Sequence, residues 1–348
     1  MSNHSAFERD AHAVMFPAFD AVHVDSWLAD LLRAGTVAVI LGESREEYVA
    51  RRMTPARRER ETSRSLRGLT SALEASTDTP LLVAVDQEPW GIQRLHALVP
   101  QFPAADALTK MTDTDIENVA RSVASAAREM GVNAFLSPVL DRLEGNNPWL
   151  FERTLDLPPS EIARIAAAFV HGVQTTGVAA IAKHFPGFPA LEHDPAVKDT
   201  AVAAKDWSAE TLTPFRAVVN AGVSGMMVGP AIVEAVDPTA PATTSSITVR
   251  ALRQDLGFRG VVVSDDLDSP ATTRGRSLEE TALASLLAGS DLLLIPGGDE
   301  VTTVAQSLAA EAVRNPIAAE RLRNAANRVR ALVNATDLGT IQGKQKRG

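Results

Sequence analysis

The stretch Gly260-Val-Val-Val-Ser-Asp-Asp-Leu267 joins a run of β-branched apolar residues directly to two carboxylates. An apolar run without polar alternation is typical of a strand that is buried on both faces, as in a parallel sheet covered by helices. Because side chains alternate along a strand, we expect Asp265 to point inward and Asp266 to turn away, where it caps a helix or braces a loop. The stretch therefore predicts a buried parallel strand that delivers a carboxylate at its end.

Short apolar runs of the same kind recur along the whole chain. Together with 260–265 they occupy residues 12–16, 36–41, 81–86, 134–140, 178–183, 225–229 and 291–296. Amphipathic stretches follow them at 24–33, 56–75, 113–130, 159–175, 208–221, 248–256, 277–288 and 300–315, and a last one covers 317–334. Eight strands that alternate with helices in one series predict an α/β fold, a closed (β/α)8 TIM-type barrel.

A doubly wound open sheet is the alternative arrangement. Such a sheet usually carries a glycine-rich turn after its first strand, whereas this turn reads Pro17-Ala-Phe-Asp20, and the chain contains no G-x-G-x-x-G motif and no P-loop. No shift of composition marks a second domain. We therefore expect a single catalytic domain over residues 1–336, followed by a polar, disordered tail at 337–348.

The composition excludes several classes of function. There are no cysteines among the 348 residues, which rules out disulfides, zinc thiolates and a cysteine nucleophile. The net charge of −9 argues against nucleic acid or an anionic membrane as a partner. No stretch has the apolar length of a membrane span, and the first residues lack a signal-peptide core. These features predict a cytoplasmic protein, and the absence of a ligand-spaced His/Asp cluster predicts no metal and no other cofactor.

Polar side chains gather at the ends of the predicted strands, which is where a barrel carries its active site. They are Asp86 with Glu88, Asp141, Lys183 with His184, and Asp265 with Asp266; Met227 ends a further strand. An inward carboxylate can be a nucleophile, a metal ligand or a Schiff-base partner. Lys183 could form a Schiff base, as in a class I aldolase, or hydrogen-bond a substrate hydroxyl. The sequence therefore predicts an enzyme and leaves these chemistries open.

Four segments in order along the chain resemble a known family. They are Leu82-Val-Ala-Val-Asp-Gln-Glu88, Phe135-Leu-Ser-Pro-Val-Leu-Asp141, Lys183-His-Phe-Pro-Gly187 and Leu256-Gly-Phe-Arg-Gly-Val-Val-Val-Ser-Asp-Asp-Leu267. They are similar to glycoside hydrolase family 3, in particular to its single-domain β-N-acetylglucosaminidase branch. The resemblance covers nearly the whole chain.

The resemblance implies a role for individual residues. Asp265 corresponds to the family's nucleophile, which attacks the sugar in a retaining double displacement. The residues implied to hold the sugar's hydroxyls are Asp86, Arg153, Lys183 and His184, and we expect Met227 to line the same subsite. The implied activity is that of a β-glycosidase acting on β-glucosides or β-N-acetylglucosaminides. A small carbohydrate is therefore the expected partner, and Lys183 need not form a Schiff base.

The chain departs from the family in the loop that carries the acid/base. The family has an Asp-Ser-His there, whereas this loop reads Phe188-Pro-Ala-Leu-Glu-His-Asp-Pro195. Counting back from Pro214 sets Glu192-His-Asp194 over the motif, while counting forward from Lys183 sets Asp194 over the aspartate. We expect His193 to be the acid/base, oriented by Asp194 or Glu192, because its pKa suits proton transfer near neutrality. Asp194 acting alone is the alternative.

A second departure concerns the sugar and the acceptor. Asp268 stands where the family branch has a small or neutral residue, and a carboxylate there suits a hydroxyl or an ammonium better than an acetamido group. A histidine acid/base would also admit inorganic phosphate, so a retaining β-glycoside phosphorylase is one alternative. A sugar-binding pseudoenzyme that has lost its acid/base is another.

Overall fold

The structure, a computed structural model, describes residues 3–337. Except for Asp337, the predicted tail at 337–348 lies outside the described residues. Eight parallel strands form one sheet in the order β10-β1-β2-β3-β4-β5-β7-β9. A parallel bridge between Val263 and Leu292 joins β9 to the start of β10 and closes the ring. The barrel strands are β1 (Met15–Phe19), β2 (Ala38–Leu41), β3 (Leu82–Val85), β4 (Ala134–Phe135), β5 (Ala179–Phe185), β7 (Gly225–Val228), β9 (Val261–Ser264) and β10 (Leu293–Pro296). The predicted (β/α)8 barrel is confirmed.

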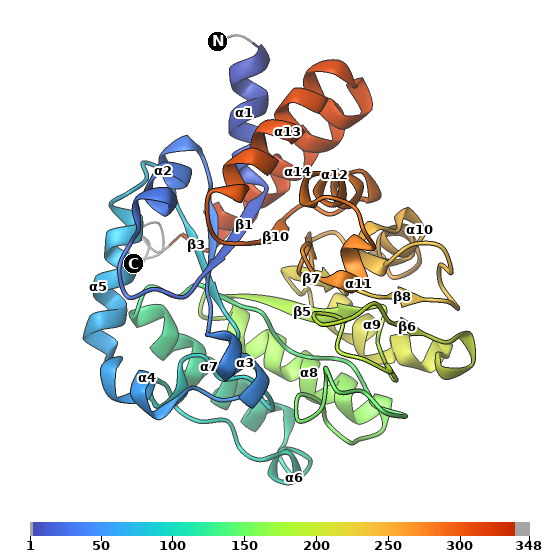
Figure 1. The fold of residues 1–348 in the computed structure, drawn as a ribbon. Helices are drawn as coiled ribbons and strands as arrows, with labels where there is room; N and C mark the ends of the chain where they lie inside the picture. The colour runs from blue at the N-terminus through green and yellow to red at the C-terminus, as the bar shows by residue number, and fades with distance from the viewer. Residues whose placement is uncertain (1–2, 338–348) are drawn as a thin grey trace.

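Helices surround the strands in the order in which they follow them along the chain (Figure 1). The longer ones are α1 (Asn3–Ala13), α2 (Ser26–Ala34), α5 (Ser63–Glu74), α7 (Asp113–Glu129), α8 (Pro159–Gln174), α9 (Thr213–Asn220), α12 (Leu278–Ala288), α13 (Glu300–Arg314) and α14 (Pro316–Ala335). Short helices lie in the loops: α3 (Arg45–Ala50), α4 (Pro55–Arg60), α6 (Ala105–Leu108), α10 (Ser246–Arg250) and α11 (Pro270–Thr273). Two short strands outside the barrel, β6 (Ala201–Val202) and β8 (Ile232–Val233), pair with each other.

Alternate residues belong to different apolar clusters in β2, β3, β4, β5, β7 and β9. On β3, Val83 and Val85 pack with the residues of α5 and α7, whereas Leu82 and Ala84 pack with residues of neighbouring strands. Both sets are buried, which explains why the strand reads as a continuous apolar run. The sheet is thus fixed from both sides, and its strand ends are held in place for a site.

The first predicted strand is wrong by three residues. Residues 12–13 end α1, and β1 begins at Met15 and continues through Pro17 to Phe19. Proline lacks an N–H and usually ends a strand, yet Pro17 lies opposite Ile295 in the parallel ladder with β10. The predicted helix at 56–75 is also divided, into α4 and α5, because Thr62 caps a new helix and its hydroxyl accepts from Ser65 N.

Within residues 3–337 no helix is both long and apolar enough to cross a lipid bilayer.

Candidate active site

A cavity of about 350 Å³ opens among the carboxyl ends of the barrel strands, where barrels place their chemistry. Seven of the residues predicted for substrate binding and catalysis line it: Asp86, Arg153, Lys183, His184, Met227, Asp265 and Asp268. The other polar lining residues are Glu43, Arg45, Tyr48, Trp149 and Asp266. Residues that lie far apart in the sequence therefore meet around one hollow.

Behind the cavity wall, Glu88 binds two cations at once. Its carboxylate accepts from Arg153 Nη2 at 2.6 Å and lies 2.8 Å from Lys183 Nζ. All three side chains are at most 2% exposed. Burial alone would raise the pKa of Glu88, but Arg153 and Lys183 hold it well below its ordinary range. Glu88 therefore stays ionised and fixes both cations.

Lys183 also forms an ion pair with Asp86, the carboxylate at the end of β3. Burial lowers the pKa of Lys183, but Asp86 and Glu88 outweigh it and raise the net value above the ordinary one. A lysine held in this way is a permanent ammonium. Because a Schiff base requires a neutral amine, the geometry disfavours aldolase chemistry and leaves Lys183 one further N–H to offer a ligand.

Tyr48, on α3, receives two hydrogen bonds on its hydroxyl. Arg153 Nη1 donates to it at 3.1 Å and Trp149 Nε1 donates at 3.0 Å. Since Arg153 Nε and Nη2 are bound to Glu88, the guanidinium is largely occupied. The Tyr48 hydroxyl retains its own proton, which makes it a donor at the cavity surface. At this wall of the cavity, the Tyr48 hydroxyl therefore offers a ligand the hydrogen-bond donor that was predicted for Arg153.

His184 is oriented by Asp141, the carboxylate that follows β4. The Nδ1 atom lies 2.8 Å from Asp141 Oδ2, and the same oxygen accepts from the backbone N–H of His184 at 3.0 Å. The ring packs against Trp149, with the two centroids 4.3 Å apart. This leaves Nε2 as the ring nitrogen available to a ligand in the cavity.

Asp265 directly follows β9 and is 7% exposed. Its Oδ1 accepts from the backbone N–H of Asp266 at 2.8 Å, whereas its Oδ2 is buried and accepts no hydrogen bond from any described residue. Burial raises the pKa of Asp265, although the His184 and Lys183 side chains oppose the rise. One carboxylate oxygen is thus held and the other is left without a partner.

Asp266 does not turn away from the cavity, and the expectation that it caps a helix or braces a loop is wrong. It lines the cavity beside Asp265. The strand ends at Ser264, so the alternation of side chains that applies within a pleated strand does not extend to Asp266. Burial, followed by the charges of Asp265 and Asp268, raises the pKa of Asp266 well above its ordinary value.

His193 and Asp194 do not line the cavity. His193 is 33% exposed, and its Nε2 lies 2.9 Å from Lys198 Nζ and 3.4 Å from Glu192 Oε1. Asp194 Oδ1 accepts from Ala196 N at 2.9 Å. The structure therefore keeps the two predicted acid/base residues outside the lining of this cavity.

Sequence reasoning missed the cavity wall formed after β2, which supplies Glu43, Arg45 and Tyr48. A signal was present, since Gly42-Glu43 directly follows the predicted strand at 36–41 and stands at a strand end like Asp86. Tyr48, the one tyrosine of the chain, lies in a helix beyond that strand end, where the strand-end rule does not reach.

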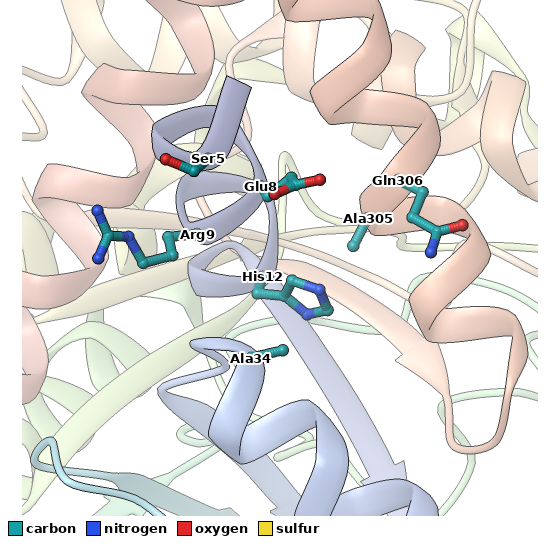
Figure 2. A pocket seen from close by; sticks show the side chains of 7 residues that line it. All are labelled: Ser5, Glu8, Arg9, His12, Ala34, Ala305 and Gln306. Carbon is teal, nitrogen blue, oxygen red and sulfur yellow. The ribbon is translucent and has the colours of Figure 1, made fainter. Parts of the chain in front are cut away.

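A separate hollow of about 480 Å³ lies between α1, α2 and α13, beside the amino end of β1 (Figure 2). Arg9 points away from Glu8 and His12, so these polar groups do not converge on one point (Figure 2). The hollow also lies away from the strand ends that carry barrel chemistry. Among the described residues, no group of three or more His, Asp or Glu side chains is arranged to hold a metal ion.

Comparison with known proteins places the chain in a family. Residues 25–332 match the model of the glycosyl hydrolase family 3 N-terminal domain. A β-hexosaminidase of Nitrosomonas eutropha is 32% identical over 260 residues, which cover 71% of this chain and 74% of that protein. The match therefore extends over most of both chains.

Two solved structures share the fold. A family 3 β-N-acetylglucosaminidase from Paenibacillus superimposes with a TM-score of 0.82 at 27% identity, over 94% of this chain. The chain spans 62% of the length of that enzyme. A β-N-acetylhexosaminidase from Beutenbergia cavernae gives a TM-score of 0.81 at 25% identity and covers 96% of this chain and 99% of its own. With the strand-end carboxylates and the paired cations around one cavity, these matches show that the chain belongs to glycosyl hydrolase family 3 and is a glycoside hydrolase.

Proposed function

We propose that this glycoside hydrolase is a retaining β-glycosidase that acts on β-glucosides or β-N-acetylglucosaminides, with Asp265 as its nucleophile. One observation carries the proposal: Asp265 Oδ2 is buried at the cavity, at the end of a barrel strand, and has no hydrogen-bond partner among the described residues. A buried carboxylate oxygen without a partner is costly. The cost is explained if this oxygen forms its bond to the anomeric carbon of a bound sugar.

In the first step Asp265 Oδ2 attacks the anomeric carbon, and the bond from that carbon to the leaving oxygen breaks while an acid protonates it. In the second step the residue that acted as the acid takes a proton from a water molecule. The oxygen of that water attacks the anomeric carbon and displaces Asp265. The two inversions retain the β configuration. Lys183 and Tyr48 donate to the sugar's hydroxyls from the N–H and O–H groups at the cavity. Because His184 Nδ1 donates to Asp141, His184 Nε2 accepts from a hydroxyl.

We assign the acid/base role to His193, with Glu192 or Asp194 orienting it and with Asp194 as the alternative. Because His193 lies outside the cavity lining, the role requires the segment that carries it to close over a bound sugar. Asp194 interacts electrostatically with Arg51, which donates to the carbonyl of Trp149 on the cavity wall at 2.8 Å. This interaction supports the assignment, because it links Asp194 through Arg51 to a residue of the cavity wall.

Water is the acceptor that the charges around the cavity favour. Lys183 and Arg153 are already paired with Asp86 and Glu88, and further carboxylates line the wall. Phosphate would meet few unpaired cations there. Phosphorolysis through the same Asp265 intermediate remains the second candidate because Arg45 also lines the cavity.

The names of the relatives favour a 2-acetamido sugar, since these proteins are a β-hexosaminidase, a β-N-acetylglucosaminidase and a β-N-acetylhexosaminidase. Asp268 at the cavity favours a hydroxyl or an ammonium instead. Both glucosides and N-acetylglucosaminides therefore belong among the substrates to be tested.

The test is to trap the intermediate with an activated 2-fluoro β-glucoside and an activated 5-fluoro β-N-acetylglucosaminide and to map the labelled peptide. We expect a single label on Asp265, and labelling at any other residue refutes the proposal. Turnover of an aryl glycoside with and without inorganic phosphate, followed by analysis of the sugar, decides the acceptor. Free sugar at a rate independent of phosphate identifies the hydrolase, whereas a sugar 1-phosphate identifies the phosphorylase.

A further inference from the structure

Glu43 is a carboxyl group in the cavity to which the mechanism above gives no role. It follows β2 by two residues and lines the cavity on the side next to the Asp86–Lys183 ion pair. The residue is partly exposed through the cavity, but its Oε2 atom is buried and has no hydrogen-bond partner among the described residues. A polar atom left in this way inside a ligand cavity is a candidate contact for the ligand.

The charged groups that face Glu43 do not neutralise it. Asp86 and Glu88 approach from the end of β3, Lys183 from β5, and Arg94 from the segment after Glu88. Lys183 is bound to the two carboxylates of β3, and Arg94 is bound to Glu61 through two nitrogens, at 2.8 and 2.9 Å. Both of these cations are therefore already paired, and Arg45, a further cation of the cavity wall, does not hydrogen-bond to Glu43 Oε2.

This environment keeps a proton on Glu43. Burial and the Asp86 charge raise the pKa of Glu43 to about 8, although Arg94 and Lys183 oppose the rise. At neutral pH Glu43 is thus a carboxylic acid, and it lies in the same cavity as Asp86, whose carboxylate is paired with Lys183. The acid can donate a hydrogen bond and the carboxylate can accept one.

The backbone at Glu43 is fixed by buried ion pairs. Arg94 Nε donates to the carbonyl of the preceding Gly42 at 2.6 Å. On the other side, Glu47 caps α3 through the backbone N–H of Ser44 at 3.1 Å and binds Arg57 Nε at 2.7 Å. A side chain carried on such a braced segment is preorganised, so that little entropy is lost when it binds a ligand.

We propose that Glu43 is a substrate-binding residue of the donor subsite. Its carboxyl group donates a hydrogen bond to a hydroxyl oxygen of a neutral sugar, while Asp86 accepts from another hydroxyl of the same sugar. The inference rests on the proposed function and deepens it by naming the ligand class at this wall: an uncharged sugar with free hydroxyls, not one that carries an ammonium there.

Calorimetry on the full chain with phenyl 1-thio-β-D-glucopyranoside and its 2-acetamido analogue tests the inference without turnover. For the wild type we expect binding to weaken about tenfold between pH 7 and pH 9, as the Glu43 proton is lost. Glu43→Gln keeps a neutral donor, so it should bind within a few-fold of the wild type at pH 7 and lose this pH dependence. Glu43→Ala should bind about tenfold more weakly at pH 7. Glu46→Gln, which changes an exposed carboxylate on α3, is the matched control.

Analogues that lack one hydroxyl locate the contact. We compare the parent thioglycoside with its 4-deoxy and 6-deoxy analogues. The analogue that lacks the hydroxyl bound by Glu43 should bind the wild type more weakly than the parent does, but should bind Glu43→Ala as well as the parent does. Additive losses for both analogues, or a pH dependence that persists in Glu43→Gln, overturn the inference. So does tighter binding of an amino-sugar thioglycoside in the wild type than in Glu43→Gln. If one of these results is found while fluoroglycosides still label Asp265 in the same preparation, only the role of Glu43 is refuted and the proposed function stands. If neither thioglycoside binds and no label forms, the proposed function itself is refuted.

Discussion

Arg153 Nη2 donates to Glu88 Oε1 at 2.6 Å, with both side chains almost fully buried, and this contact connects residues that lie 65 positions apart in the sequence. The same oxygen of Glu88 binds Lys183. One carboxylate therefore neutralises two of the cations at the active site. Removal of the carboxylate therefore leaves the buried Arg153 without its ion-pair partner and leaves Lys183 with Asp86 alone.

We expect Glu88→Ala to lower the free energy of unfolding by about 3–5 kcal/mol, since it leaves the buried Arg153 without its carboxylate partner. Chemical unfolding monitored by circular dichroism measures the change. Glu144→Ala, which breaks an exposed ion pair with Arg142, is the control and should cost less than about 1 kcal/mol. Equal effects of the two substitutions would contradict the importance of the buried pair.

Asp265→Asn should reduce kcat by at least about 1000-fold, because an amide cannot form the glycosyl intermediate. The same variant should unfold at a higher temperature than the wild type at pH 7. The pKa of Asp265 is raised in the folded state, so the folded protein binds this proton more tightly than the unfolded chain does. Wild-type stability therefore falls as pH rises from the ordinary aspartate range towards the folded pKa, and an asparagine removes that loss.

The stabilisation by Asp265→Asn should accordingly shrink at pH 4, where the wild-type carboxyl is protonated to a greater extent. Thermal unfolding at the two pH values is the measurement, with the exposed Asp255→Asn as control. If the variant gains no stability at pH 7, the pKa of Asp265 is not raised in the folded protein.

His193→Ala should abolish turnover of glycosides with poor leaving groups and spare activated aryl glycosides, which need no protonation. Azide should partly restore the second step by replacing the activated water. Steady-state rates on a series of aryl glycosides measure both effects. If Asp194→Ala gives this pattern and His193→Ala does not, the acid/base is Asp194. If neither variant changes turnover, the acid/base lies outside this segment.

Asp268→Ser should shift the ratio of kcat/KM towards N-acetylglucosaminides over glucosides by about tenfold or more, because it removes a carboxylate that suits an acetamido group poorly. Asp268 lines the cavity and is exposed to solvent, but the protein atoms around its carboxyl partly desolvate that group and raise its pKa. Competition between the two aryl glycosides measures the ratio, and Asp299→Ser, at an exposed residue outside the cavity lining, is the control. A wild type that already strongly prefers the N-acetylglucosaminide would refute this role for Asp268.

The barrel and much of its active site could be predicted from the sequence. Strands buried on both faces read as apolar runs, and a barrel places the residue after each run at one end of the ring, so that Asp86, Lys183 and Asp265 were expected to meet. The structure places all three at one cavity. These predictions needed only the apolar pattern of short stretches of chain and the rule that a barrel carries its active site at the carboxyl ends of its strands.

Only the tertiary structure decided the partners of those residues. Tyr48 receives hydrogen bonds from Trp149 and Arg153, about a hundred positions away, and Glu43 lines the same cavity as Asp86 and Lys183. The inward position of Asp266 and the continuation of β1 through Pro17 were likewise set by neighbouring strands and the cavity. Local propensity and alternation describe how a segment prefers to fold, whereas burial and hydrogen bonding between distant segments depend on which surfaces the closed barrel brings together. The sequence by itself therefore determined where the chemical groups emerge from the sheet, and the tertiary structure decided which of them are paired and which are left free to bind a sugar.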